Sequence, residues 1–357
     1  MIPGSIHNLL AFAYDIDSPA YIAMAEGRWG EVWRPFANRV LGPMIARYTG
    51  FGTLQIVAGI LFAAAVFGLL KRRDVPLCRA LPFLLAPWLV NFALNIYMPD
   101  LVTCALTAAV FAAYAGCGPF AAIVLLPLAI MARESSAVIA LVWLCLLVRD
   151  WICGRRTRRQ ILSLAVCILA AVFVGMKATA LISAGSPGNI NGMGVLYLPV
   201  KAVVNGIFSV TGLSPWNDVY ARELPVFYTH APLWKMVCPL FLRLGRFTEI
   251  GIYEWHPWQV LTTVKVLILS FGALIPYAIL NWRALNSRRF DGWLELAFWS
   301  GLVYWALTPI CGFSPNRYIG YAWPFVWFAV LPSLAEERRR TYLIWLIAHL
   351  AVIGVCL

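Results

Sequence analysis

The sequence predicts an all-α protein: a polytopic transmembrane helix bundle of about ten spanning segments, with two long non-cytoplasmic loops. Three observations predict this fold. The chain of 357 residues is 62% hydrophobic and only 12% charged, whereas about a quarter of the residues in a soluble domain are charged. Apolar runs of spanning length recur along it, and its basic residues fall in short runs between them. We therefore expect a single integral-membrane domain, 1–357.

The apolar runs give the expected helices in chain order. A helix that crosses a bilayer needs roughly 17–25 predominantly apolar residues. The runs at 119–132 and 135–148 are shorter, and we expect two half-buried helices that meet at Arg133-Glu134. The complete set is 52–70, 81–98, 101–116, 119–132, 135–148, 161–182, 260–281, 293–311, 319–334 and 342–356.

The basic clusters predict the orientation of these segments. Cytoplasmic loops of membrane proteins carry an excess of Lys and Arg, and threading ten segments through the membrane places all four clusters on one face. The net charge of +12 is then explained by anionic lipid, and we expect no nucleic-acid partner. The opposite face receives a first outer loop, 14–50, with an acidic motif, and a second, aromatic-rich outer loop, 184–259. The clusters are Lys71-Arg72-Arg73 with Arg79, Arg149 to Arg159, Arg283 with Arg288-Arg289, and Arg338-Arg339-Arg340.

The nine cysteines indicate neither a metal site nor a redox site. The sequence contains no C-x-x-C pair, which zinc knuckles and dithiol motifs require. We interpret the cysteines as small apolar packing residues. The N-terminus lacks a basic n-region, so we expect the first spanning helix to direct membrane targeting.

Asp15 and Asp17 are the candidate catalytic residues. They stand two apart in the first outer loop, and in an extended stretch their side chains share a face. A carboxylate there is suited to act as a general base on a hydroxyl group. The close pair is also suited to hold a divalent cation, Mg or Mn. The alternative is structural, because Asp17-Ser18-Pro19 also has the pattern of a helix N-cap.

Three basic residues are candidates for binding a phosphate. Arg39 lies on the outer face, where a guanidinium either binds phosphate or snorkels to lipid headgroups. Arg317 stands at the outer start of a helix, where the helix dipole also favours an anion. Lys177 lies near the outer end of the 161–182 segment and could extend outward.

Asp100, Arg133 and Glu134 are charged residues at turns between apolar segments, and we assign them to substrate binding. Charges at this depth are expected to pair or to contact a ligand. Asp100 follows a proline, so it has the alternative role of capping the next helix. For Arg133-Glu134 the alternative is that the two side chains form an ion pair with each other.

The second outer loop holds the remaining substrate-binding candidates, Tyr228, His230, Glu254 and His256. Aromatic rings interleaved with acidic and imidazole groups suit a carbohydrate, whose C–H faces stack on rings. The interfacial aromatic belt of membrane proteins is the alternative interpretation. The two histidines are 26 residues apart, which is no known metal motif.

Several of these motifs together resemble the GT-C superfamily of integral-membrane glycosyltransferases. The resemblance extends along the chain as a pattern of individually short motifs. They are Tyr14-Asp15-Ile16-Asp17-Ser18 with Tyr21 and Ala25-Glu26-Gly27, Asn38-Arg39 through Pro43, Pro99-Asp100, Ala132-Arg133-Glu134 and Asn316-Arg317-Tyr318.

The resemblance implies a function in glycan biosynthesis of the cell envelope. A sugar would pass from a polyprenyl-phosphate donor to a glycan, lipid or protein acceptor. The expected location is a bacterial inner (plasma) membrane, with the active site facing the periplasm or exterior. Asp15 or Asp17 would be the base or a metal ligand, and Arg39 or Arg317 would contact the donor phosphate.

Two other functions remain open from the sequence. In a transporter or flippase of lipid-linked sugars, Lys177 and Arg133-Glu134 would line a path through the bundle. In a non-catalytic assembly subunit, the outer loops would bind partner proteins. Charged groups gathered around one outward-facing cavity favour the enzyme, whereas a ladder of charges through the bundle favours transport.

Overall fold

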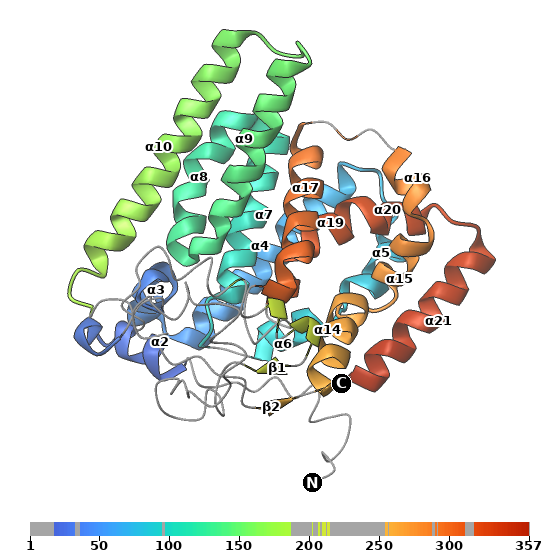
Figure 1. The fold of residues 1–357 in the computed structure, drawn as a ribbon, viewed down its shortest axis with the longest axis horizontal. Helices are drawn as coiled ribbons and strands as arrows, with labels where there is room; N and C mark the ends of the chain where they lie inside the picture. Colours follow the sequence, from blue (N-terminus) through green and yellow to red (C-terminus); the bar gives the residue numbers. More distant parts are fainter. Residues whose placement is uncertain are drawn as a thin grey trace, which may run out of the picture.

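The computed structural model describes most of the chain as a helix bundle (Figure 1). In the described part, the one departure from helix and turn is a two-residue antiparallel pairing of β1 (Leu213–Ser214) with β2 (Glu254–Trp255). The predicted all-α class is therefore confirmed. The described residues are 18–32, 36–94, 97–186, 257–287, 290, 292–310 and 318–356, with 202, 206–207, 209–211, 213–214 and 254–255 between them.

The helices follow the predicted apolar runs closely. Where the sequence predicted a loop at 14–50, the described residues form short helices, because Ser18–Ala25 and Leu41–Thr49 are apolar enough to pack. The elements are α2 (Ser18–Ala25), η1 (Trp29–Glu31), η2 (Phe36–Asn38), α3 (Leu41–Thr49), α4 (Phe51–Lys71), α5 (Leu77–Leu84), α6 (Pro87–Leu94), α7 (Asp100–Cys117), α8 (Pro119–Ala132), η3 (Glu134–Ser136), α9 (Ala137–Ile152), α10 (Arg158–Ile182), α14 (Pro257–Leu269), α15 (Leu274–Leu280), α16 (Trp282–Ser287), α17 (Gly292–Leu307), η6 (Thr308–Ile310), η7 (Ile319–Ala322), α19 (Trp323–Phe325), the π-helical turn η8 (Val326–Val330), α20 (Leu331–Ala335) and α21 (Arg339–Cys356).

Four helical stretches are long and apolar enough to cross a membrane: α4, α7, η3 with α9, and α10. The pair α14 and α15 counts as a fifth if its 85° bend lies within one span. An integral-membrane protein is therefore supported. The expected number of about ten spans is not confirmed in the described residues, because several of the predicted runs fold as short or broken helices.

The predicted run 81–98 is one of these broken helices. It forms α5 and α6, separated at Leu85 and Ala86. Pro87 explains the break, since proline has no N–H to donate and disfavours helical backbone in the residue before it. Ala86 is the residue that Pro87 restricts, and α5 has already ended before it, since its C-cap Leu85 is extended, with φ −74° and ψ 101°.

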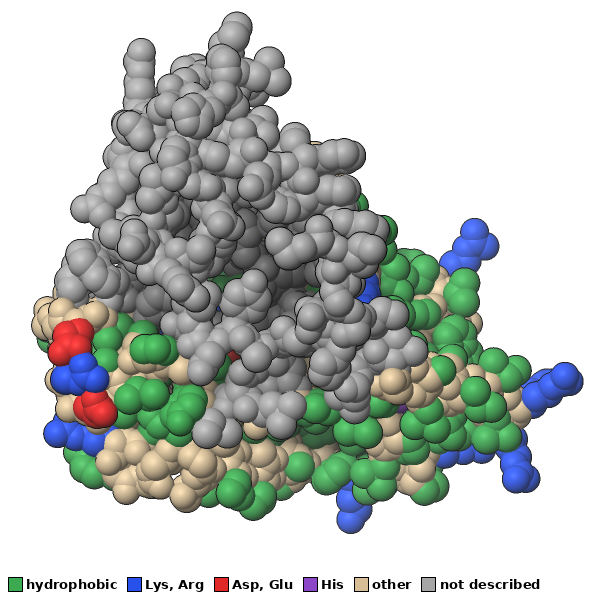
Figure 2. Space-filling view, turned by 90° about the horizontal axis from the view of Figure 1, so that it is seen from below, with side chains coloured by type: hydrophobic (Ala, Val, Ile, Leu, Met, Phe, Trp, Pro, Cys, Tyr) green, Lys and Arg blue, Asp and Glu red, His purple; other side chains and the backbone are tan. Residues whose placement is uncertain are grey.

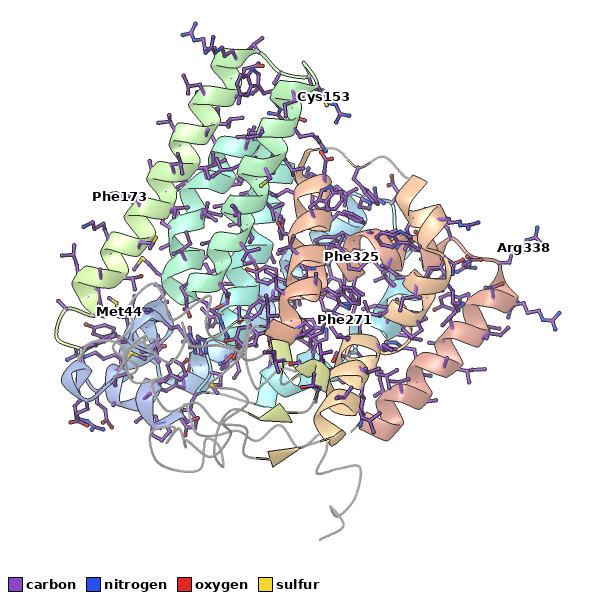
Figure 3. All side chains as sticks on the ribbon, viewed as in Figure 1. Met44, Cys153, Phe173, Phe271, Phe325 and Arg338 are labelled. Atoms are coloured by element: carbon purple, nitrogen blue, oxygen red, sulfur yellow. The ribbon has the colours of Figure 1, made fainter. Side chains whose placement is uncertain are left out.

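The predicted run 319–334 forms the most enclosed part of the bundle. Of the residues from Ile319 to Ala335, every one is buried. Its helix is irregular, with a π-helical turn in the middle, and Trp323 and Trp327 are its largest fully buried side chains. The ring centroids of Phe62 on α4 and Trp323 lie 5.1 Å apart, and Phe325 points into the interior in Figure 3. This segment is therefore surrounded by protein.

The two ends of the bundle differ. The connection between α9 and α10 lies at one end, and α2 and α3 lie at the other (Figure 1). In Figure 3, Cys153 and Met44 mark these opposite ends. Figure 2 views the molecule from this end; among the described residues, apolar side chains are interspersed with other groups, and acidic and basic side chains lie together at one edge. At the α9–α10 end, Arg149 forms an ion pair with Glu295 that joins α9 to α17.

Candidate functional site

A buried ion pair joins the start of α7 to the end of α8. A guanidinium nitrogen of Arg133, Nη1, donates to Asp100 Oδ1, and the side chains are 1% and 3% exposed. The Tyr321 hydroxyl donates to the same carboxylate oxygen, at 2.5 Å. Arg133 Nη1 also donates to the Tyr321 oxygen, at 2.8 Å. Three segments far apart in the sequence thus meet at one carboxylate.

Two aromatic rings flank the Arg133 guanidinium. Its central carbon lies 4.9 Å from the centroid of Tyr318 and 5.0 Å from that of Tyr321. Such cation–π contacts stabilise a positive charge that has lost its water. Arg133 Nε and Nη2 are buried and have no hydrogen-bond partner within the described part of the chain. These two nitrogens carry three N–H groups, which are without an acceptor in the described part of the chain.

A second arginine lies beside this pair. Arg39 is buried, and its Nη1 donates to the Tyr21 hydroxyl at 2.5 Å. Its Nε and Nη2 face the two carboxylate oxygens of Glu134, each at 3.4 Å. Burial alone would lower the pKa of Arg39, but Tyr21 and Glu134 outweigh it and raise that pKa well above the ordinary value. Arg39 therefore keeps its charge at any physiological pH.

Local backbone structure separates the two pairs. α8 ends at Ala132, and Arg133 is extended, with φ −160° and ψ 128°. Because neighbouring side chains of an extended segment point in opposite directions, Arg133 and Glu134 reach different partners. Glu134 opens the 3₁₀ turn η3 and its side chain is 43% exposed. Tyr304 on α17 donates to the carbonyl of Ser135 at 2.6 Å and fixes this turn.

We name these side chains the charged cluster. It contains four of the residues predicted from the sequence, brought together from separate segments. The alternative interpretation of Arg133 and Glu134, an ion pair with each other, is not the arrangement found, since Arg133 pairs with Asp100 and Glu134 with Arg39. The alternative role of Asp100, as the N-cap of the next helix, is not the one found, because Pro99 holds the N-cap position and Asp100 is the first residue of α7, where its carboxylate accepts from Arg133 and Tyr321. The charged cluster consists of Arg39, Asp100, Arg133 and Glu134 with Tyr21, Tyr318 and Tyr321.

The remaining predicted residues lie elsewhere or outside the described residues. Lys177 is exposed on α10, and its ammonium lies 5.6 Å from the ring centroid of Phe173, which points away from the bundle in Figure 3. Lys177 therefore faces the surroundings and not the charged cluster. Glu254 belongs to β2, whose side chains are not described. Asp15, Asp17, Arg317, Tyr228, His230 and His256 are outside the described residues.

The tyrosines of the charged cluster were not predicted as site residues. Tyr21 and Tyr318 each stand within a motif named above, and Tyr321 follows one by three positions. A phenol is a common interfacial residue in membrane proteins, so the sequence alone gave no reason to single these three out. Tyr321 could have been found from its position, because it is the hydroxyl-bearing residue of the predicted run 319–334 that stands nearest to Arg317.

The described residues hold no group of three or more His, Cys, Asp or Glu side chains placed to bind a metal ion. The predicted cation ligands, Asp15 and Asp17, are not among those residues. Comparisons with protein-family models, with curated proteins and with solved structures found no match. The functional argument therefore rests on the motifs and on the geometry of the charged cluster.

Proposed function

We propose that this chain is a membrane glycosyltransferase of the GT-C type. It moves a sugar from a polyprenyl-phosphate donor to a lipid-linked, glycan or protein acceptor on the non-cytoplasmic face. One observation carries this proposal: four charged residues from the motifs that resemble the GT-C superfamily gather at the end of the bundle that holds α2 and α3. Separate snorkelling or capping residues would have no reason to converge.

The charges of the cluster fit the chemistry of this transfer. Displacement at the anomeric carbon needs a base for the acceptor hydroxyl and positive charge for the departing polyprenyl phosphate. Arg39 and Arg133 bring two buried guanidinium groups to the cluster, and Arg133 keeps Nε and Nη2 without a partner in the described part. The proposal assigns the base to Asp15 or Asp17, and a further phosphate contact to Arg317. It assigns no phosphate role to Lys177.

The distribution of buried charge supports an enzyme over a transporter or flippase. Among the described residues, the buried Asp, Arg and His side chains are Arg39, Asp100 and Arg133 at one end, Asp150 near the other and His349 in α21, so three of the five gather at one end. A path for ions or headgroups is typically lined by ionisable groups at several depths.

The proposal also includes the topology, the location and the cofactor expected from the sequence. These are about ten spanning segments with the basic clusters in the cytoplasm, a bacterial inner membrane, and a divalent cation, Mg or Mn, at Asp15 and Asp17.

A transfer assay tests the proposal. Purified protein is mixed with a panel of polyprenyl-phosphate sugars, and sugar transfer or release is measured with and without Mg²⁺ or Mn²⁺. If Asp15 is the base, Asp15→Asn lowers the rate by ~10²–10⁴-fold, because an amide takes no proton. Asp17→Asn is milder if Asp17 only caps a helix, since asparagine caps equally well.

Asp74→Asn is the matched control for this assay. Asp74 is in the α4–α5 turn with φ 53°, a conformation that asparagine also tolerates, and transfer is expected to be unchanged. Near-normal transfer by both Asp15→Asn and Asp17→Asn would remove the first loop from catalysis. Movement of lipid-linked sugar across vesicles without any transfer would instead identify a flippase.

A further inference from the structure

His349 is a buried histidine in the middle of α21, and the proposed function does not use it. Its side chain is 0% exposed and packs on Phe83 of α5, with ring centroids 4.7 Å apart. An ionisable side chain enclosed within a membrane bundle is costly unless its ring nitrogens have partners. Both nitrogens of His349 have one, and both partners are backbone groups at helix interruptions.

The two interruptions lie side by side. One is the break at Leu85 and Ala86, between α5 and α6, and the other is the 85° bend between α14 and α15. The backbone N–H of Trp88 reaches the carbonyl of Ser270 at 3.4 Å and links them directly. An interrupted helix leaves N–H and C=O groups without their usual partners, and in a membrane these must be satisfied by protein.

The imidazole of His349 satisfies one backbone group at each interruption, because one ring nitrogen accepts a hydrogen bond and the other donates one. Nδ1 accepts a hydrogen bond from the Ala273 N–H, at 3.2 Å. Nδ1 therefore has a free lone pair and carries no proton. Nε2 then carries the proton and donates it to the carbonyl of Leu85, at 2.9 Å. The neutral ring thus connects α21 to both interruptions at once.

Gly272 allows the ring to come this close. It has φ +60°, and a Cβ built on it would lie 2.1 Å from Nδ1 and 2.4 Å from Cε1 of His349. Any residue larger than glycine would displace the imidazole. The approach of this backbone to the ring is therefore specific to the glycine at this position.

We propose that His349 is a proton-binding site that locks the two helix interruptions together when neutral and releases them when protonated. A proton added at Nδ1 converts the acceptor into an N–H donor that faces the Ala273 N–H. That hydrogen bond is then lost, and an imidazolium is left in an apolar enclosure. The bend between α14 and α15 separates from α21 as a result.

Other titratable groups on the packed elements do not bond to this ring within the described part of the chain. Arg79 on α5 donates to the carbonyls of Ala335 and Glu337. Tyr277 on α15 donates to the Glu337 carboxylate at 2.9 Å, and Tyr342 on α21 donates to the Arg79 carbonyl at 3.1 Å. The other titratable residues of these elements are Cys78 on α5, Lys265 on α14, Arg339 and Arg340 at the start of α21 and Cys356 at its end.

Hydrogen exchange of the Ala273 amide tests the proposal. Protection in purified, full-length protein is measured by mass spectrometry between pH 8 and pH 5.5 and corrected for the intrinsic exchange rate. Below pH ~6.5, the ordinary range for histidine, protection is expected to fall by up to about tenfold per pH unit, because one proton is bound on release. Constant protection over this range would overturn the proposal.

His349→Gln separates protonation from packing. Glutamine carries one acceptor and one donor but does not titrate, so protection is expected to stay high and to lose its pH dependence. His7→Gln is the control and should keep the wild-type pH dependence. If the protection of the Ala273 amide in His349→Gln falls with pH as it does in the wild type, the assignment to His349 is refuted.

A second measurement applies if His349→Gln does not fold. ¹⁵N NMR of the histidines in the wild-type protein reports which nitrogen of His349 carries the proton, and a protonated Nδ1 at pH 8 would contradict the proposed lock.

Discussion

Arg133 donates to the carboxylate of Asp100 from 33 positions away in the sequence, and water reaches neither side chain. The pair ties the end of α8 to the first residue of α7, and Tyr321 brings the enclosed segment 319–335 to the same carboxylate. Stability and the proposed function therefore involve the same few atoms. Several measurable consequences come from this arrangement and from the other close contacts described above.

Removing one member of the pair is expected to destabilise the fold strongly. Asp100→Ala or Arg133→Met leaves an uncompensated buried charge, which typically costs about 3–5 kcal/mol. The double variant should recover most of this loss, because no lone charge remains. Unfolding of the purified protein in detergent measures both effects. The partly exposed pair Arg149–Glu295 is the control, and Arg149→Gln should cost no more than about 1 kcal/mol. Single variants as stable as the control would contradict a buried pair.

Tyr321→Phe should test the hydroxyl of the charged cluster while keeping its ring. The hydroxyl donates to a carboxylate, so its removal is expected to cost about 1.5–3 kcal/mol in the free energy of unfolding. Tyr304→Phe is the matched variant, since the Tyr304 hydroxyl donates to the neutral carbonyl of Ser135. Its expected cost is about 0.5–1.5 kcal/mol. Equal costs for the two variants would indicate that Asp100 gains nothing from Tyr321.

Gly272→Ala should destabilise the contact with His349. The new methyl group would overlap Nδ1 of the imidazole, and overpacking of this kind costs about 1–3 kcal/mol. Gly154→Ala provides the comparison, because Gly154 also has a positive φ, 64°, but no atom near its Cβ position. Gly272→Ala combined with His349→Ala should cost less than the two single changes added together. Strict additivity, measured by thermal unfolding, would rule out the clash.

Thiol labelling tests the orientation of the bundle. Cys153 is exposed at the end that holds α9 and α10, which the basic clusters assign to the cytoplasm. A membrane-impermeant maleimide should modify Cys153 only in inverted vesicles and Met44→Cys only in intact cells, with peptide mass spectrometry to locate each label. Cys153→Ser serves as the control for the labelled peptide. Modification of both positions from one side would overturn the predicted topology.

The boundaries of the long apolar helices were predictable because they follow from the hydropathy of the local sequence. α4 begins and ends within a residue of its predicted run, and α7 and α10 differ by three residues or fewer at either end. Hydropathy does not distinguish contact with lipid from contact with protein. The segment 319–335 therefore looked like one more span, although other helices enclose it. The bend after α14 escaped prediction for a similar reason, because its contacts with Trp88 and His349 join residues that are far apart in the sequence.

The charged residues of the candidate site were predictable from the sequence, but which of them form ion pairs with each other was not. A charged residue next to apolar runs is expected to pair with another group or to bind a ligand. This expectation identified Arg39, Asp100, Arg133 and Glu134. Which partner each one takes depends on backbone conformation and tertiary contact. The extended backbone of Arg133 directs it away from Glu134, and no pattern in the sequence encodes that single residue's departure from helix.

The enclosure of segment 319–335 constrains the order of assembly. Ribosomal synthesis delivers α4, α7 and α8 long before this stretch, so Asp100 and Arg133 emerge while Tyr321 is still to be translated. Until Trp323 is translated, Phe62 on α4 and Phe111 on α7 lack the ring that they contact in the finished bundle. The packing around segment 319–335 is therefore completed only by a part of the chain that is synthesised late.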